Sequence, residues 1–280
     1  MEIHRDRHRF QQACRALRRD GRRVGFVPTM GALHAGHTAL MDEASKHADA
    51  LAVSIFVNPL QFAEGEDLSK YPRTLEADLA ACEAHGVALV FTPEPGSMYP
   101  QGFSTGVHVG DLSTTLEGEH RPTHFDGVTT VVNKLFMLVG ECVAVFGKKD
   151  YQQWRIIQRM VRDLDMPVEV IGHEIVREED GLALSSRNVY LSADERRRAL
   201  ALSEGLKRAR QAWNDGDHDP ARLEAMARAH IESAFDRIDY VALREATTLG
   251  NVEAEHEECV MLAAAHLGRT RLIDNLELRR

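Results

Sequence analysis

The sequence predicts an α/β protein, in which a doubly wound parallel sheet is followed by a smaller C-terminal α+β domain. Short apolar runs alternate with helical patterns as far as residue 171, and this alternation is typical of parallel sheets. The pattern changes near Val176, where longer helices and then short strands follow. Because 280 residues are enough for two domains with a core each, we place the domains at residues 1–175 and 176–280.

The first domain is built from apolar runs that are too short for helices. These predicted strands are residues 24–27, 51–57, 88–91, 142–146 and 168–171. Helical spacing predicts a surface helix around residues 10–17, a helix from residue 38, and helices over residues 74–85, 127–139 and about 152–164. We expect Pro28 to end the first strand. In such a Rossmann-like sheet the ligand crevice lies at the carboxyl ends of the strands, which Asn58, Gly147 and a loop with two histidines follow.

The second domain is predicted from its longer and more charged elements. A helix is expected from residue 192 to about 213, followed by a break at residues 214–217 and a further helix after Pro220. Short strands are expected near residues 240–243 and 259–263. The run Arg196 to Arg198 is interpreted as a solvated helix face.

Composition excludes several classes of protein. The net charge is −9 with basic and acidic residues interspersed, so we expect no nucleic-acid partner. No apolar run approaches the ~20 residues of a membrane helix, and the N-terminus lacks the pattern of a signal segment, so we expect no membrane partner. The four cysteines are scattered, which is typical of reduced thiols in a cytoplasmic protein.

The segment from Val24 to His37, VGFVPTMGALHAGH, carries the clearest chemical signal. Gly31 and Gly36 allow close backbone approach, and His34 and His37 fall where a strand meets a helix. The unpaired N–H groups and the dipole of a helix N-terminus favour an anion there, and neutral imidazole can donate a hydrogen bond to phosphate. Two alternatives stay open: a structural or surface pair of histidines, and a zinc site, although no third ligand is visible nearby.

Several further motifs occur in a characteristic order. HAGH at residues 34–37 is similar to the His-x-Gly-His signature of the nucleotidylyltransferase superfamily. The other motifs are SIFVNPLQF from Ser54, EDLSKYPRT from Glu66, LEGEHRPTHFDGV from Leu116, FGKKDYQQ from Phe146, DGLALSSRN from Asp180 and RLIDN from Arg271. Together they resemble the pantothenate synthetase family over nearly the whole chain.

The resemblance implies a ligase that joins (R)-pantoate to β-alanine with ATP and Mg²⁺, through a pantoyl adenylate, and releases AMP and pyrophosphate. It also implies a homodimer. Three other functions remain possible: a different nucleotidylyltransferase, a class I aminoacyl-tRNA synthetase, and a nucleotide-sensing module without turnover. The synthetase is disfavoured because an acidic chain of this length offers little surface for tRNA.

By resemblance, three segments bind the nucleotide. The phosphates are lined by Met30, Gly31, Ala32, Leu33, His34, Ala35, Gly36 and His37, and a second loop comprises Gly147, Lys148, Lys149 and Asp150. A third segment, which closes on the pyrophosphate, comprises Leu184, Ser185, Ser186 and Arg187, and Val176 contacts the adenine through its backbone. The residues expected to act in catalysis are His34, His37, Lys149, Ser185, Ser186 and Arg187. His37 is the conventional proton donor, but a helix N-terminus disfavours a histidine cation, so hydrogen-bond donation is the better supported role.

The remaining predictions concern pantoate and the metal. Gln61 and Gln153 match the pantoate-binding glutamines, Asn58, Tyr71 and Arg121 are further substrate-binding candidates, and Asp78 is the candidate Mg²⁺ ligand. Two positions depart from the family. Lys148 replaces a glutamate beside the nucleotide, and Thr123 replaces a glycine near Arg121, which puts the placement of Arg121 in doubt.

Overall fold

The computed structural model describes residues 1–62, 67–69 and 71–280, and these form two compact units. The first unit comprises Met1–Lys148 and Gln152–Glu174, and the second comprises Lys149–Tyr151 and Ile175–Arg280. The short segment Lys149–Tyr151 therefore groups with the second unit, although the sequence pattern places it in the first domain. Within the described residues, no helix is long and apolar enough to cross a membrane.

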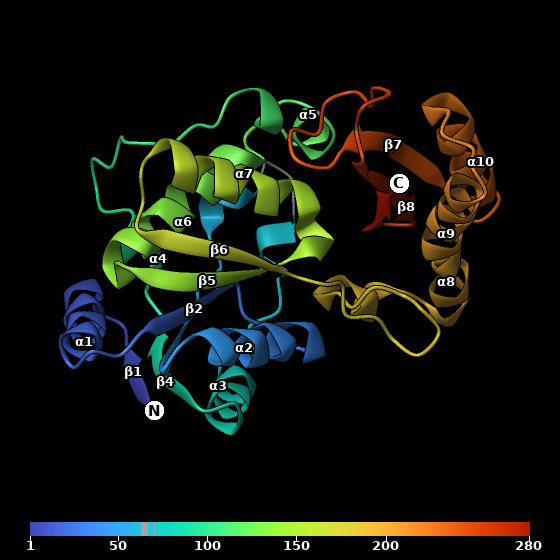
Figure 1. Ribbon diagram of the computed structural model, residues 1–280. Helices are drawn as coiled ribbons and strands as arrows, with labels where there is room; N and C mark the ends of the chain where they lie inside the picture. The colour runs from blue at the N-terminus through green and yellow to red at the C-terminus, as the bar shows by residue number, and fades with distance from the viewer. Residues whose placement is uncertain (63–66, 70) are drawn as a thin grey trace. The chain divides into compact units, whose positions relative to one another are not determined.

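The first unit is a six-stranded sheet, and every strand pairing in it is parallel (Figure 1). The strand order is β1-β4-β3-β2-β5-β6. The strands are β1 (Glu2–His4), β2 (Val24–Thr29), β3 (Ala50–Ile55), β4 (Val87–Phe91), β5 (Cys142–Gly147) and β6 (Val168–His173). The predicted doubly wound sheet is thus confirmed, with the three-residue edge strand β1 as an unpredicted addition.

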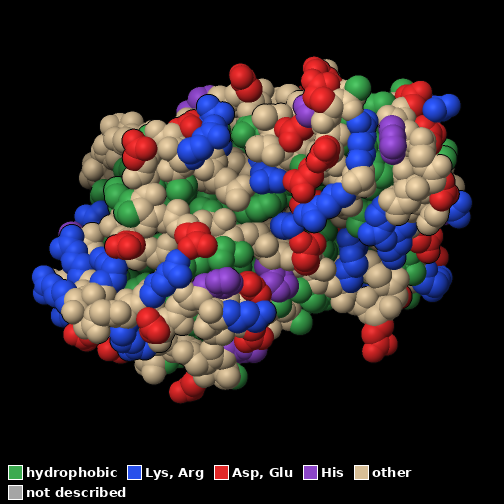
Figure 2. Space-filling view, viewed as in Figure 1, with side chains coloured by type: hydrophobic (Ala, Val, Ile, Leu, Met, Phe, Trp, Pro, Cys, Tyr) green, Lys and Arg blue, Asp and Glu red, His purple; other side chains and the backbone are tan. Residues whose placement is uncertain are grey.

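Helices cover both faces of this sheet (Figure 1). They are α1 (Arg7–Arg19), α2 (Ala35–His47), α3 (Leu75–Ala84), α6 (His124–Val139) and α7 (Tyr151–Asp163). α2 and α3 lie on one face and α6 and α7 on the other, while α1 packs against α6. The Asp6 carboxylate caps α1, and the buried Phe10 of α1 stacks on Phe91 with ring centroids 4.6 Å apart. The opposite side of α1 is exposed and basic (Figure 2).

The expectation that Pro28 ends the first strand is wrong. β2 continues to Thr29, and Pro28 pairs in register with Ser54 of β3. On its other side β2 pairs with β5 only at Gly25 and Phe26. Proline lacks an N–H group, so it is tolerated in an interior strand only where the ladder is already open on one side. β2 and β5 therefore stop pairing before their carboxyl ends. The strand order reverses between these two strands, which makes this gap the topological switch point where such sheets bind ligands.

Short elements link the strands at this edge of the sheet. They are the helices α4 (Pro95–Met98) and α5 (Glu117–His120) and the 3-10 turns η1 (Pro59–Gln61), η2 (Asp67–Ser69), η3 (Asp111–Ser113) and η4 (Lys148–Asp150). η1 lies directly against α6, because Gly127 lets the backbones meet. A Cβ atom at Gly127 would lie 2.0 Å from the Leu60 carbonyl oxygen. This contact holds the segment after β3 in one position.

The second unit is a three-stranded antiparallel sheet with helices and a 3-10 turn. The elements are η5 (Ser186–Tyr190), α8 (Ala193–Arg198), α9 (Leu200–Asn214), α10 (Pro220–Glu232), β7 (Arg237–Glu245), β8 (Glu258–Leu267) and β9 (Thr270–Arg279). The single helix expected from residue 192 is wrong: it divides at the buried Ala199. The charged α8 stays near the surface, whereas α9 turns Leu202, Leu206 and Trp213 into the core. β9 was not predicted as a strand.

Candidate active site

The loop that contains both histidines is a tight turn between β2 and α2. Gly31 and Ala32 adopt left-handed backbone conformations, with φ values of 85° and 51°. α2 then begins at Ala35, with His34 as its N-cap residue and His37 in its first turn. The structure thus places both histidines at the N-terminus of a helix, where unpaired N–H groups and the helix dipole favour an anion.

Both imidazole rings accept hydrogen bonds from the backbone, which determines their tautomers. The Gly36 N–H donates to Nδ1 of His34 over 3.1 Å, and the His34 N–H donates to Nδ1 of His37 over 3.3 Å. A ring nitrogen that accepts a hydrogen bond carries no hydrogen, so the ring hydrogen lies on Nε2 in both residues. The ring centroids are 4.2 Å apart. The loop therefore holds two neighbouring neutral rings whose Nε2 atoms are the donors.

Asp78 of α3 holds this turn from the side. Its carboxylate accepts the N–H groups of Ala32 and Leu33 over 3.1 and 2.8 Å and the Thr74 hydroxyl over 3.1 Å, and only 2% of the residue is exposed. A Cβ at Gly31 would lie 3.0 Å from the same carboxylate, so glycine suits this position for space as well as for its φ. The sequence offered no sign of this role.

The contacts of Asp78 bear on the two metal hypotheses. No group of three or more His, Cys, Asp or Glu side chains in the described part of the chain could hold a metal ion. The structure therefore lends no support to a zinc site at the two histidines. The Asp78 carboxylate already binds backbone and hydroxyl donors, so its role as a Mg²⁺ ligand stays a prediction that these contacts do not favour.

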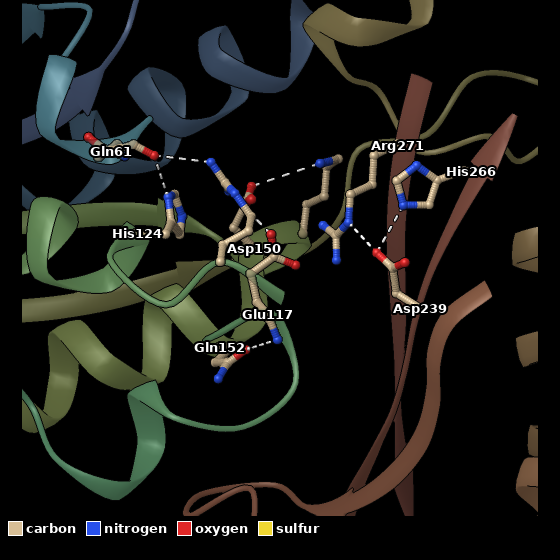
Figure 3. Close-up of polar contacts among 10 residues, drawn as sticks. Gln61, Glu117, His124, Asp150, Gln152, Asp239, His266 and Arg271 are labelled. Atoms are coloured by element: carbon tan, nitrogen blue, oxygen red, sulfur yellow. Dashed lines mark hydrogen bonds and ion pairs between the residues drawn. The ribbon is translucent and has the colours of Figure 1, made fainter. Parts of the chain in front are cut away.

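Gln61 lies in a polar cluster after the carboxyl end of β3, together with Asn58, Arg121 and His124 (Figure 3). The Asn58 Nδ2 donates to Gln61 Oε1 over 3.0 Å, and both residues are buried. Arg121 Nη2 and His124 Nδ1 both bind the Gln61 carbonyl oxygen, over 3.1 and 2.9 Å. Three predicted substrate-binding residues, Asn58, Gln61 and Arg121, are thus brought together. A fourth, Tyr71, is buried and packs edge-on against Phe62, with ring centroids 5.9 Å apart.

The two adjacent glutamines at the start of α7 have different surroundings. Gln152 is buried, and its Oε1 accepts the Glu117 N–H over 3.0 Å (Figure 3). Its Nε2 donates to the carbonyls of Leu112 and Thr115. Gln153, the predicted pantoate ligand, is half-buried. Gln152 therefore anchors the segment that carries Glu117. Sequence reasoning missed this role because the partners of Gln152 lie 35 to 40 residues away in the chain.

The predicted residues of the second unit lie in segments tied to β9. The Lys149 carbonyl accepts Asn275 Nδ2 over 2.9 Å, and the Lys149 ammonium lies 3.9 Å from the Asp150 carboxylate. Arg177 forms a bidentate ion pair with the buried Asp274: Nη1 lies 2.7 Å from Oδ2, and Nη2 lies 2.8 Å from Oδ1. Asp274 and Asn275 belong to the RLIDN motif, whose structural role the sequence did not reveal.

The segment from Leu184 to Arg187 in the same unit forms hydrogen bonds within that unit. The Leu184 N–H donates to the Val176 carbonyl over 3.0 Å. Ser185 caps the turn η5, because its Oγ accepts the Arg187 N–H over 3.2 Å. The carbonyl of Val176 and the hydroxyl of Ser185 thus each have a partner within the unit.

The match with known proteins extends over almost the whole chain. A family model described as pantoate-beta-alanine ligase matches residues 2–277. The chain belongs to this ligase family. It is 50% identical over 276 residues to the pantothenate synthetase of Syntrophotalea carbinolica, which covers 98% of each sequence. The resemblance inferred from the ordered motifs is confirmed.

Solved structures of ligase-family proteins agree with this fold. The chain is similar to the pantothenate synthetase of Thermus thermophilus, with 43% identity, a TM-score of 0.93 and 100% coverage of both chains. It is also similar to the pantoate-beta-alanine ligase of Francisella tularensis, solved in complex with beta-gamma ATP and beta-alanine. That likeness has 31% identity, a TM-score of 0.81 and coverage of 99% of this chain and 97% of the other.

The two departures from the ligase-family pattern have local explanations. Thr123 adopts a φ of −100°, which any residue can take, so the missing glycine does not disturb Arg121. Arg121 binds Glu117 over 3.2 Å as well as the Gln61 carbonyl, whereas its role toward substrate stays a prediction. The ammonium of Lys148 pairs with the Glu174 carboxylate over 2.5 Å and lies 5.4 Å from the Trp154 ring centroid. Its added positive charge therefore has a carboxylate partner in the first unit.

Proposed function

We propose that the chain condenses (R)-pantoate with β-alanine through a pantoyl adenylate, with cleavage of ATP to AMP and pyrophosphate. The observation that carries this proposal is the N-terminus of α2 at the switch point of the sheet, where two neutral histidines present Nε2 donors. Family membership supplies the substrates, and the ligand names of the Francisella structure agree with ATP and β-alanine.

In the first step the pantoate carboxylate attacks the α-phosphorus of ATP. A carboxylate oxygen–phosphorus bond forms, the bond between the α-phosphorus and the bridging oxygen breaks, and pyrophosphate leaves with that electron pair. Negative charge builds up on phosphate oxygens, so fixed N–H donors such as His34 and His37 supply the stabilisation. The substrate brings its own nucleophile, and no covalent enzyme intermediate is required.

In the second step the β-alanine amine attacks the acyl carbon of the adenylate. The carbon–nitrogen bond forms, AMP leaves with the electron pair of the acyl–oxygen bond, and the amine loses a proton.

We assign Lys149, Ser185, Ser186 and Arg187 to phosphate binding, with Val176 at the adenine. Ammonium, hydroxyl and guanidinium groups are suited to phosphate oxygens.

We assign pantoate to the polar cluster around Gln61. Gln61 and Gln153 are proposed to bind its polar groups through their amides, with Asn58, Tyr71 and Arg121 around them. The support is that Asn58, Gln61 and Arg121 share one hydrogen-bond network at the carboxyl edge of the sheet. β-Alanine is the second substrate of this proposal.

Magnesium, assembly and location complete the proposal. The described residues do not form a protein cage for Mg²⁺, and Mg²⁺ commonly binds through nucleotide phosphates and few protein carboxylates, so we expect it to arrive with ATP. A homodimer is proposed from family resemblance, and light scattering would give the mass in solution. A cytoplasmic location is proposed because all four cysteines are buried free thiols.

Pyrophosphate exchange into ATP tests the reaction directly. Exchange is expected to require pantoate and Mg²⁺ but not β-alanine, since the adenylate forms before the amine reacts. Exchange that is indifferent to pantoate would instead identify another nucleotidylyltransferase. ATP binding without AMP release, when both substrates are present, would identify a nucleotide sensor.

A further inference from the structure

A tyrosine outside the predicted site is hydrogen-bonded to the residue that orients Gln61. Tyr99 follows the short helix α4, and its hydroxyl donates to Asn58 Oδ1 over 2.7 Å. Asn58 in turn donates from Nδ2 to Gln61 Oε1 and to the Gly127 carbonyl, each over 3.0 Å. The Leu60 N–H also points at Asn58 Oδ1, over 3.4 Å. These contacts form one chain from Tyr99 to Gln61 within the first unit.

The direction of this chain follows from two backbone groups. The Gly127 carbonyl can only accept, so the amide atom of Asn58 that faces it is Nδ2. The Leu60 N–H can only donate, so the other atom of Asn58 is Oδ1. Gln61 must then turn Oε1 toward Asn58, which makes Nε2 its outward donor. A donor is the correct polarity for the carboxylate and hydroxyl oxygens of pantoate.

Tyr99 is held in place by its own surroundings. Its ring packs edge-on against Phe103, with centroids 5.1 Å apart, and near Phe56 at 6.2 Å. The Lys134 ammonium lies 5.8 Å from the Tyr99 centroid and 4.8 Å from that of Phe103. Burial raises the pKa of the Tyr99 hydroxyl, so the hydroxyl remains a donor across the working range of pH.

We propose that Tyr99 is a positioning residue for pantoate recognition: its hydroxyl holds the Asn58 amide, and through it the Gln61 amide, in the orientation that presents Nε2 to the substrate. This inference rests on the proposed role of Gln61 in pantoate binding. The alternative is that Tyr99 only packs against its aromatic neighbours. The two roles differ in whether the hydroxyl or the ring matters.

Two substitutions separate the hydroxyl from the packing. Tyr99→Phe keeps the ring and removes the hydroxyl, whereas Phe103→Leu keeps the hydroxyl and alters the ring contacts. We expect Tyr99→Phe to raise the KM for pantoate by roughly 2- to 12-fold, the range for one neutral hydrogen bond, with the KM for ATP nearly unchanged and the melting temperature lowered by no more than a few degrees. Phe103→Leu is expected to lower the melting temperature and to change the pantoate KM by less than about 2-fold.

Gln61→Leu and the double variant complete the test. If Tyr99 acts through Gln61, adding Tyr99→Phe to Gln61→Leu gives no further loss of pantoate affinity. Additive losses, an unchanged pantoate KM in Tyr99→Phe, or an equal effect of Phe103→Leu would overturn the positioning role alone. If Gln61→Leu itself leaves pantoate binding unchanged, the role of Gln61 fails, and the inference about Tyr99 fails with it.

Discussion

Replacing Asp78 by asparagine tests whether this carboxylate holds the histidine loop or binds metal. The carboxylate accepts two backbone N–H groups and a hydroxyl in a site that is 2% exposed. Asparagine keeps one oxygen but turns an NH₂ group toward a backbone N–H, where two donors oppose each other. A hydrogen bond to a charged group contributes about 1.5–3 kcal/mol, so the turn loses roughly that amount.

The strained backbone makes this loss consequential. Ala32 has a φ of 51°, and a non-glycine residue in the left-handed region costs about 1–2 kcal/mol. With Asp78 weakened, the turn can relax toward ordinary backbone angles and carry His34 out of position. At about 1.4 kcal/mol per tenfold, we expect the adenylation rate of Asp78→Asn to fall roughly 10- to 150-fold.

Pyrophosphate exchange over a range of Mg²⁺ concentrations is the assay. We expect a lower maximal rate with the Mg²⁺ half-saturation point unchanged, because Asp78 acts on the loop. Asp42→Asn is the matched control, since it removes an exposed carboxylate from α2 itself and should leave the rate nearly intact. A rate restored by high Mg²⁺ would show that Asp78 binds metal, and a wild-type rate would refute the role in the turn.

Three further predictions concern the histidines, the glutamines and the second unit. His34→Ala and His37→Ala should each lower the adenylation rate by roughly 10²–10³-fold at saturating ATP with little effect on folding, and near-normal rates would return both residues to a structural role. Gln61→Leu and Gln153→Leu should weaken pantoate binding roughly 10- to 150-fold in calorimetry and change the ATP dissociation constant less than about threefold; the opposite pattern would place these glutamines at the nucleotide. The Asp239 carboxylate accepts hydrogen bonds from Arg271 and His266 (Figure 3). Burial alone would raise the pKa of Asp239, but these hydrogen bonds outweigh burial and lower the pKa. The stability that this carboxylate contributes is therefore present above its unfolded pKa and is lost as the pH falls through its folded pKa. Melting temperatures below about pH 4 should therefore drop less steeply in Asp239→Asn than in the wild type, and equal slopes would contradict this account.

Elements whose signal is local could be predicted from the sequence. Apolar runs and helical spacing are read over a few neighbouring residues, and they located five strands of the parallel sheet and the helices around it. The ordered motifs also identified the family, because each motif lies in one short stretch of chain. The strand-to-helix position of His34 and His37 belongs to the same class of prediction.

Features that depend on a partner distant in the sequence could be seen only in the fold. Pro28 continues β2 because β3 pairs with it while β5 does not, and periodicity cannot show which neighbours a strand has. β9 was missed because Arg271 and Asp274 interrupt its apolar pattern, and those charges are tolerated only where Asp239 and Arg177 meet them. Asp78, Gln152 and Tyr99 likewise act on groups 35 to 46 residues away. A side chain's role in this site follows from the atoms it meets after folding, and the sequence does not place those atoms beside it.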